Sequence, residues 1–263
     1  MFTPIGFFAE EAGGLPISFN PYAYYDALDP ASYDATNKTW SDLAKVNTTD
    51  DSTFDTAVGN LPNHNSNGYW VINDQNAQDS AFTYNNSTST TNPFSYLVGD
   101  VHTIFTYVRP QLYRSNAIDI LCNSTSAGSV LLGTYDIGGS YGNKFARAHV
   151  WASAVQFTDG PSFDVTLGQW IIIGQRYTDV GGGQKRLDVF TCDVNGTVTI
   201  TQGTNFTPGT TTSAPVELRV GARNTTHYGD YDIGAYALYK DDLSDANIQT
   251  VCNELSTRFG EPT

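Results

Sequence analysis

Short segments rich in β-branched and aromatic residues follow one another from residue 101 onward, and they constrain the fold more than any other feature of the chain. The clearest are residues 101–108, 170–177 and 231–239. Turn signals lie between such segments: Asn195 and Gly196, for example, supply the positive φ angles of a tight hairpin. Short strands at spacings of roughly 8–12 residues are typical of a sandwich or jelly roll. The sequence therefore predicts an all-β fold, an antiparallel β-sandwich.

One segment near the C-terminus has a helical period instead. Ser244 can serve as the N-cap, and Asp245 places a carboxylate in the first turn, where it complements the helix dipole. Five apolar residues then share one helix face: Ile248, Val251, Cys252, Leu255 and Phe259. Gly260 suits the position after the last turn, and Pro262 blocks continuation. We expect one amphipathic helix over residues 245–259 that packs on the sandwich.

The charge of the chain and the length of its apolar stretches each exclude one class of partner. Its 263 residues include 27 acidic and 13 basic ones, a formal net charge of −14. Because nucleic-acid binding depends on Lys and Arg that neutralise phosphates, we expect no nucleic-acid partner. No stretch approaches the roughly 18 apolar residues of a membrane span, so we expect no membrane insertion. The hydrophobic fraction of 40% suffices for the core of one domain.

The three cysteines, Cys122, Cys192 and Cys252, stand far apart in the sequence. They form neither a CxxC pair nor a zinc pattern, so we expect reduced, mostly buried thiols. The first residues lack the basic segment and the long apolar run of a secretory signal, and we expect no signal peptide.

Residues 1–20 are apolar, with Gly and Pro interspersed, and show neither a helical nor a sustained strand period. One interpretation is a first strand and irregular coil that covers the sandwich. The other is an assembly arm that docks on another chain through Phe2, Ile5, Phe7 and Phe8, since a large exposed apolar patch usually marks an interface. We therefore divide the chain into a possible docking segment, residues 1–20, and one sandwich domain, residues 21–263.

Two stretches in the second half resemble one known family. Residues 229–239 (GDYDIGAYALY) followed by 242–248 (DLSDANI) resemble the last strand and helix start of concanavalin A-like or laminin-G-like domains. Residues 170–177 (WIIIGQRY) with 186–196 (RLDVFTCDVNG) are similar to a hairpin of the same family. The resemblance implies a jelly roll with one C-terminal helix. It departs at Gly234 and Ala235, where the family often has an acidic pair, which puts any cation role there in doubt.

The opening of the domain carries a narrower resemblance. Residues 25–33 (YDALDPASY) and 39–43 (TWSDL) are similar to the first motif of such domains in tailed-phage virion proteins. The matches keep the order of the family and span about residues 22–260. They are specific for the fold more than for function, since this sandwich also serves lectins and hydrolases.

Catalytic patterns are missing from the sequence. Glycosidases of this fold place two or three carboxylates alternately on one strand, and the reaction needs an acid together with a nucleophile or base. Glu217 has Arg219 and Gly221 as its same-face neighbours. His102 and His149 lie in expected strands, where a satisfied core or sheet histidine is the ordinary reading. We therefore expect no enzyme.

Two loops have the residue types that bind glycans, namely aromatic rings with Asn and Asp groups. They are residues 135–143 and 224–230, although either can also be an ordinary Gly-rich turn. The candidate ligand-binding residues are Tyr135, Asp136, Tyr141, Asn143, His227, Tyr228 and Asp230. We expect no metal-ligating residues and no cofactor, with calcium as an open option because it prefers several oxygen ligands.

These observations together favour a virion structural or adhesive protein: capsid decoration, collar or fibre. Its expected partners are other virion protein subunits, with the chain as a homo-oligomer, and a host surface glycan. We expect it at the virion surface after synthesis in the host cytoplasm. A lectin-like carbohydrate-binding module is the alternative, and a glycoside hydrolase or lyase the third hypothesis.

Overall fold

The computed structural model of the protein describes residues 15–44, 53–54, 56–57, 59–72, 80–85, 101–111, 118–123, 130–136, 144–150, 157–158, 166–207, 217–224 and 227–260. Two large antiparallel sheets and one helix dominate them. The predicted fold class, an antiparallel β-sandwich with a C-terminal helix, is confirmed.

The first large sheet, here the helix-covered sheet, has the order β16-β15-β14-β9-β20-β7-β6, and β1 also pairs with β20. Its strands are β1 Ala23–Asp26, β6 Asn63–Asn65, β7 Tyr69–Ile72, β9 His102–Pro110, β14 Ile171–Gly181, β15 Gln184–Cys192, β16 Val198–Thr201 and β20 Tyr231–Tyr239.

The second large sheet, here the opposite sheet, has the order β13-β12-β11-β10-β17-β8-β5. Its strands are β5 Thr56–Ala57, β8 Phe82–Asn85, β10 Ile118–Asn123, β11 Val130–Asp136, β12 Lys144–Val150, β13 Phe157–Thr158 and β17 Glu217–Val220. Two small sheets complete the fold: β2 Tyr33–Asp34, β3 Thr39–Ser41 and β4 Thr53–Phe54 form one, and β18 Ala222–Asn224 and β19 His227–Tyr228 form the other.

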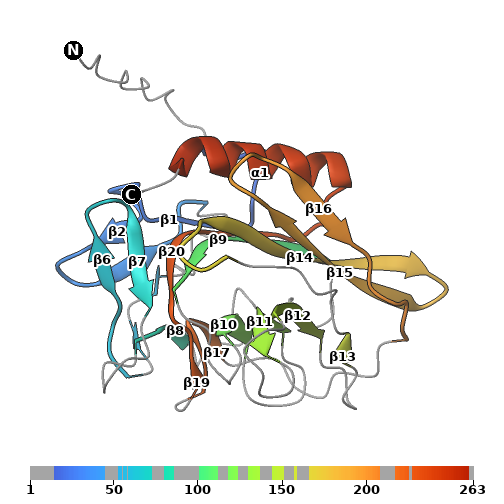
Figure 1. Ribbon diagram of the computed structural model, residues 1–263, viewed down its shortest axis with the longest axis horizontal. Helices are drawn as coiled ribbons and strands as arrows, with labels where there is room; N and C mark the ends of the chain where they lie inside the picture. Colours follow the sequence, from blue (N-terminus) through green and yellow to red (C-terminus); the bar gives the residue numbers. More distant parts are fainter. Residues whose placement is uncertain are drawn as a thin grey trace.

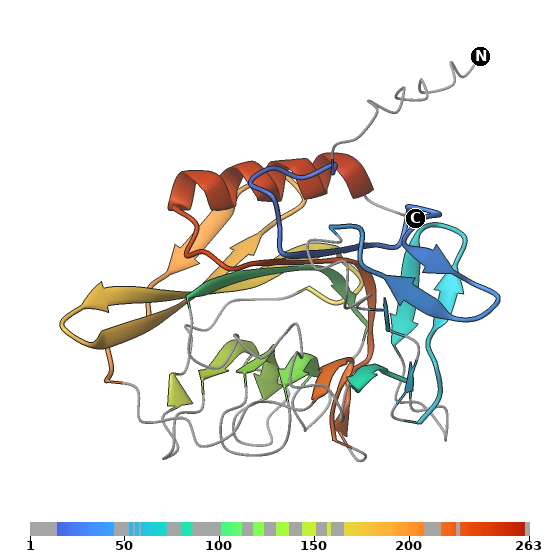
Figure 2. The same cartoon turned by 180° about the vertical axis from the view of Figure 1, so that it is seen from behind.

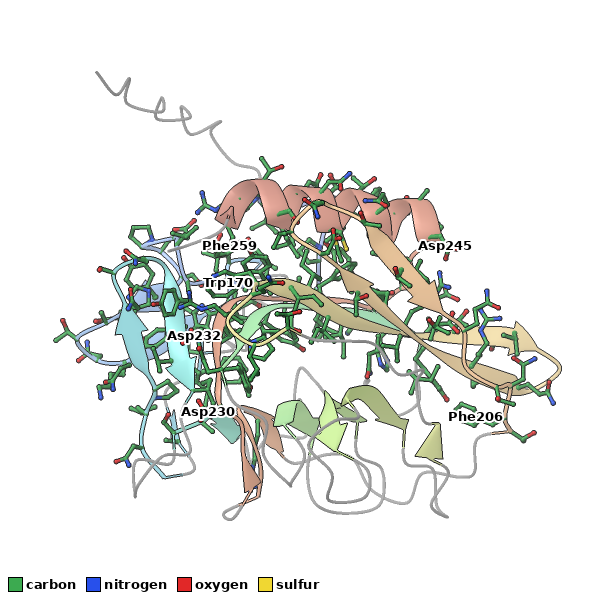
Figure 3. All side chains as sticks on the ribbon, in the orientation of Figure 1. Trp170, Phe206, Asp230, Asp232, Asp245 and Phe259 are labelled. Atoms are coloured by element: carbon green, nitrogen blue, oxygen red, sulfur yellow. The ribbon has the colours of Figure 1, made fainter. Side chains whose placement is uncertain are left out.

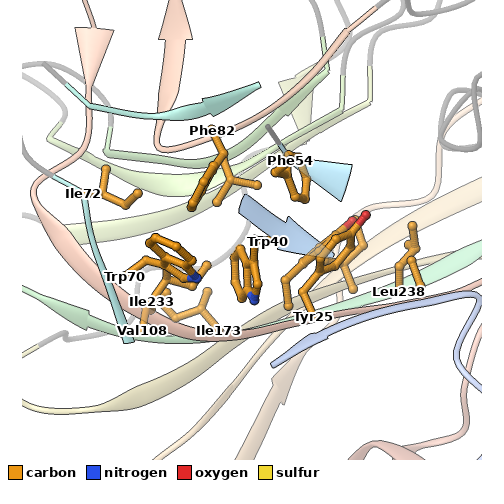
Figure 4. Packing of buried hydrophobic residues seen from close by; sticks show 14 of the residues in the cluster. Tyr25, Trp40, Phe54, Trp70, Ile72, Phe82, Val108, Ile173, Ile233 and Leu238 are labelled. Carbon is orange, nitrogen blue, oxygen red and sulfur yellow. The ribbon is translucent and has the colours of Figure 1, made fainter. Parts of the chain in front are cut away.

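The molecule has three layers (Figures 1 and 2). The opposite sheet faces one side of the helix-covered sheet, and helix α1, Asp245–Phe259, lies across the other side. Aromatic rings fill the space between the sheets (Figure 4): Tyr25, Trp40 and Phe54 lie beside Trp70 and Phe82. The ring centroids of Trp70 and Phe82 are 4.9 Å apart in an edge-on contact, an arrangement that aromatic pairs favour.

Strand β20 is buried along its whole length because both of its faces are covered. Four residues point into the space between the sheets: Tyr231, Ile233, Tyr236 and Leu238. Ala235, Ala237 and Tyr239 contact the helix layer. A register shift between Ile233 and Ala235 inserts Gly234 as a β-bulge and so changes which residues face inward. A Cβ at Gly234 would lie 3.1 Å from both Phe259 and Tyr107, so the helix end lies close against this glycine.

Helix α1 occupies the predicted residues, and its five predicted apolar residues are its buried ones. The Ser244 side chain accepts a hydrogen bond from the Asn247 backbone amide, as expected of an N-cap. Gly260 ends the helix with a φ of 58°, a left-handed angle that glycine adopts without strain. No helix in the described part of the chain has the length and apolarity that a membrane crossing requires.

Ion pairs hold both ends of this helix on the sheet. Near the N-terminal end, Arg176 of β14 contacts Asp245 at 2.7 Å and Asp188 of β15 at 2.7 Å. Near the C-terminal end, Arg258 donates to the buried Asp26 of β1 at 2.9 Å. The helix is therefore part of the domain and not an appendage to it.

Residues 15–20, the end of the predicted arm, pack on this chain's own helix and sheet. Ile17 is buried in the layer beneath α1. The Ser18 backbone amide donates to Glu254 at 2.7 Å, and the Tyr239 hydroxyl donates to the Ser18 carbonyl. This part agrees with the covering-coil interpretation. The assembly residues Phe2, Ile5, Phe7 and Phe8 lie outside the described residues, so the docking hypothesis stays a prediction.

Candidate functional site

The first predicted loop begins where β11 ends. Tyr135 and Asp136 are the last residues of β11, and their backbone partners on β12 are Phe145 and Lys144. Tyr141 and Asn143 lie outside the described residues.

The second predicted loop contains the β18–β19 hairpin. Ala222 pairs with Tyr228, and Asn224 pairs with His227. Strand β17, which precedes the hairpin, pairs Leu218 with Asn123 and then Arg219 with Cys122, so it runs toward the start of β10. The start of β10 also pairs with the end of β11, since Ile118 is the partner of Thr134. Both predicted loops therefore leave the opposite sheet at the same end, on either side of β10.

Asp230 carries the chain from this hairpin into the helix-covered sheet. It is buried, and its carbonyl accepts a hydrogen bond from the Gln111 backbone amide at 2.9 Å. Gln111 follows β9 directly, and its side chain donates to Asp232 at 2.5 Å. Arg109 of β9 is the strand partner of Asp232 and contacts its carboxylate at 2.8 Å. We call the region where β9 and β11 end and β20 begins the sandwich end.

Two aromatic side chains hold Arg109 in place. Its guanidinium lies over the rings of Tyr69 and Trp170, at 5.0 and 5.1 Å from their centroids. Trp170 in turn stacks on Tyr107 at 4.8 Å with an interplanar angle of 6°. In Figure 3, Phe259, Trp170, Asp232 and Asp230 follow one another from the helix end down the side of the molecule. These residues form a polar cluster that is continuous with the packed layer beneath α1. Its members are Arg109, Gln111, Asp230 and Asp232, together with Tyr69 and Trp170.

The electrostatics of the cluster depend mainly on burial. Burial raises the pKa of the Asp232 carboxyl above its ordinary value, and hydrogen bonds from Arg109 and Gln111 act in the opposite direction. The charge of Asp230 adds to the rise. Because Asp232 binds Arg109 and Gln111 at once, it orients both side chains, and this is a positioning role.

Both carboxylates of this region are shielded from solvent. Asp230 and Asp232 are only 6% and 3% exposed, so a polymeric substrate would not reach both carboxylates. Within the described residues, no group of three or more His, Cys, Asp or Glu side chains is placed to hold a metal ion. The buried His102 lies 3.0 Å from Gln175 and stacks on Tyr177, in agreement with its reading as a satisfied core histidine.

Sequence reasoning found Asp230 but missed the groups around it: Tyr69, Arg109, Gln111, Trp170 and Asp232. The spacing of Asp230 and Asp232, two residues apart at the start of a strand, is the sequence signal that places these two carboxylates together. Nothing local links either of them to Tyr69 or Trp170, because those contacts join distant strands.

The chain matches no protein-family model and no curated protein. Among solved structures it is similar to the binding domain of botulinum neurotoxin DC in complex with SialylT, with a TM-score of 0.59, 10% identity, and coverage of 90% of this chain and 52% of that one. A structure described as a receptor binding domain gives a TM-score of 0.58, 10% identity, and coverage of 90% and 51%.

An enzyme of similar fold also matches. The sialidase of Trypanosoma rangeli in complex with 2,3-difluorosialic acid has a TM-score of 0.52 and 11% identity, with coverage of 89% of this chain and 33% of that one. The chain thus spans about half the length of the two binding domains and about a third of the sialidase. Identities this low show a shared β-sandwich fold. The jelly-roll part of the predicted resemblance is confirmed, and its tailed-phage type stays a prediction.

Proposed function

We propose that this chain is a non-enzymatic binding domain that recognises carbohydrate at the sandwich end. The observation that carries the proposal is that both Tyr-, Asn- and Asp-rich loops leave the opposite sheet at one end, and that the second loop runs through Asp230 into a fixed polar cluster. Similar sandwiches support it, since the toxin binding domain is in complex with SialylT and the sialidase with a sialic acid derivative.

The polar cluster supplies what glycan recognition needs from a protein. Asp232 holds Arg109 and Gln111 before any ligand arrives, and Tyr69 and Trp170 restrict Arg109 further. Preformed groups lose little conformational freedom on binding, which raises affinity. Gln111 is exposed, and because its side-chain nitrogen donates to Asp232, its side-chain oxygen is the group proposed to meet a ligand. The proposed outer contacts are the loop residues Tyr135, Asp136, Tyr141, Asn143, His227 and Tyr228.

A glycan array followed by titration calorimetry tests this proposal. Gln111→Ala and Tyr228→Ala should each weaken binding of the best array ligand about tenfold, the effect of losing roughly one good hydrogen bond or ring contact. Gln202→Ala, at an exposed glutamine beyond β16, is the matched control and should bind as the parent does. Failure of the parent to bind any glycan on the array would refute the proposal.

The setting that we propose is the surface of a virus particle, with the chain as a capsid decoration, collar or fibre subunit that forms homo-oligomers. Residues 25–33 and 39–43, whose sequence resembles phage virion domains, form β1, the following turn, β2 and β3. Antibodies against the purified domain should label intact virus particles in electron micrographs. If the chain is a cellular lectin instead, the virus particles should stay unlabelled.

Absence of catalysis is part of the proposal. A glycosidase needs two carboxyl groups that both reach the substrate, whereas Asp232 is buried and paired with Arg109. We expect no turnover of β-glucans, alginate, agar or carrageenan, with or without calcium. Reproducible cleavage that disappears in Asp230→Asn would identify a hydrolase instead.

A further inference from the structure

Two indole N–H groups in the aromatic core lack a hydrogen-bond acceptor. Trp40 of β3 and Trp70 of β7 are fully buried and belong to the cluster between the two large sheets. Among the residues that the structure describes, neither Nε1 atom finds a hydrogen-bond partner. A buried N–H group without an acceptor costs free energy, and most such groups in native proteins bind either protein or ordered water. These two nitrogens therefore need an acceptor.

The two indole rings are neighbours in this core. Their centroids lie 6.3 Å apart, with an interplanar angle of 52°. Figure 4 shows both nitrogen atoms on the side of the rings that faces the helix-covered sheet. Phe82 packs on both indoles and Phe54 on that of Trp40, but a phenylalanine side chain carries no oxygen or nitrogen acceptor. A single acceptor beside both nitrogens would satisfy them.

Two half-buried rings, those of Tyr33 and His64, join the indoles in one group of four. Tyr33 is the strand partner of Trp40 in the β2–β3 pair, and His64 is the strand partner of Trp70 in the β6–β7 pair. The His64 ring stacks on Tyr33 with centroids 3.9 Å apart, and it meets Trp70 edge-on at 4.9 Å. Strand pairing and ring contacts thus close a circle of Tyr33, Trp40, Trp70 and His64, here the ring quartet.

The hydrogen bond of His64 decides which of its ring nitrogens carries the proton. Its Nε2 lies 2.8 Å from the carbonyl oxygen of Ala27, which only accepts, so Nε2 carries the hydrogen and donates. In a neutral imidazole the other nitrogen is then an acceptor. Burial lowers the pKa of His64, which favours the neutral ring. The ring that contacts Trp70 therefore offers one acceptor, Nδ1.

We propose that the ring quartet is a binding site for one internal water molecule, which accepts hydrogen bonds from Trp40 and Trp70 and donates one to Nδ1 of His64. A water oxygen has two lone pairs and two hydrogens, so it matches two N–H donors and one imidazole acceptor. Buried waters make about three hydrogen bonds on average. The water links the β2–β3 hairpin to the β6–β7 edge of the helix-covered sheet. The proposal does not depend on the ligand of the sandwich end.

A crystal structure of the full chain, at a resolution that shows ordered water, tests the site. We expect density for one water at about 2.7–3.2 Å from both indole nitrogens and beside Nδ1 of His64. Tyr33→Phe is the matched control: it keeps all four rings and removes only a hydroxyl, so it should retain the water. His64→Phe keeps a ring but removes the acceptor, and it should lose the water. The proposal is overturned if the parent has no such water or if His64→Phe retains it.

Nuclear magnetic resonance on the isotope-labelled parent gives a second test that does not require any variant to fold. The indole protons of Trp40 and Trp70 should both show rotating-frame contacts with water, and the nitrogen shifts of His64 should report the tautomer protonated at Nε2. Indole protons that are shifted upfield and lack contact with water would mean that aromatic ring faces accept them. That result, or a His64 ring protonated at Nδ1, overturns the proposal.

Discussion

At the scale of single residues, the buried Asp26 makes stability depend on pH. Its carboxylate accepts hydrogen bonds from the Leu28 amide, the Tyr24 hydroxyl and Arg258, yet burial is the largest influence and raises its pKa. A folded-state pKa above the unfolded one gives stability that is fully present below the unfolded pKa and is lost as pH rises through the folded pKa. The free energy of unfolding of the parent, relative to Asp26→Asn, should therefore fall as the pH rises above the ordinary carboxyl pKa of about 3.9. Urea titrations at several pH values measure it.

Asp34 is the control for this experiment because its shift has the opposite sign. It is half-buried at the end of β2, and hydrogen bonds from Asn37 lower its pKa. A lowered pKa gives stability that is present above the unfolded pKa and is lost as pH falls through the folded one. The parent should therefore gain stability over Asp34→Asn with rising pH, if only slightly. Parallel pH profiles for the two variants would contradict the roles assigned to these carboxylates.

Gly174 of β14 offers a second residue-scale prediction. A Cβ there would lie 2.1 Å from the Phe190 ring and 2.4 Å from the Ile104 carbonyl oxygen, and the second of these is backbone. Gly174→Ala should therefore lower the free energy of unfolding by about 2–3 kcal/mol, as overpacking does in a filled core. Gly182→Ala, in the open hairpin turn, should cost less because only its positive φ of 64° opposes the change. Equal losses would mean that the strand shifts freely at Gly174.

Few of these residue-level contacts can be predicted from the sequence. Asp230 was identified because it lies in a loop with the composition of a glycan site. Arg109, Gln111 and Asp232 were not, because their contacts depend on the pairing of β9 with β20, whose residues are more than 120 positions apart. The burial of Asp26 has the same cause, since Arg258 reaches it from the other end of the chain.

At the scale of elements, α1 gives the sharpest prediction of stability. Leu255 is fully buried and Phe259 is 6% exposed, and both belong to the layer between the helix and the sheet. Leu255→Ala and Phe259→Ala should each lower the free energy of unfolding by about 2–5 kcal/mol, because they leave a cavity. Thr257→Ala changes an exposed position on the same helix and should be nearly neutral. If both core variants melt like the parent, the helix is not docked as the structure places it.

The helix and the strands show which signals in a sequence are sufficient to predict an element. Local patterns predicted α1 completely, because its cap, apolar face and terminal glycine lie within one segment. They also predicted the strand at 170–177, although β14 extends to Gly181, where the glycine turn begins. Gly221, whose φ is 104°, separates β17 from β18. Strand β1 was missed because its partner, β20, lies at the far end of the chain.

At the scale of the whole molecule, the three-layer arrangement explains why the helix-covered sheet is buried on both faces. Helix α1 and residues 15–20 cover the outer side of the helix-covered sheet, and the aromatic core fills its inner side. A chain with only 15% charged residues can supply both layers without exposing many apolar side chains. Residues 15–20 of the N-terminal segment are therefore part of the domain.

Two truncations test how much of the N-terminal segment the domain needs for its stability. Deletion of residues 2–14 should leave the melting temperature nearly unchanged, because it keeps Ile17 and Ser18, whose contacts join the segment to the helix and the sheet. Deletion of residues 2–20 should lower it by about 5–10 °C, because it exposes the cluster around Ile17 and removes the hydrogen bonds of Ser18 to Glu254. If Phe2, Ile5, Phe7 and Phe8 form the assembly arm, the shorter deletion should also abolish the oligomer in sedimentation velocity runs. A shorter deletion that unfolds the domain would place those four residues in the core, and one that leaves the oligomer intact would place the interface elsewhere.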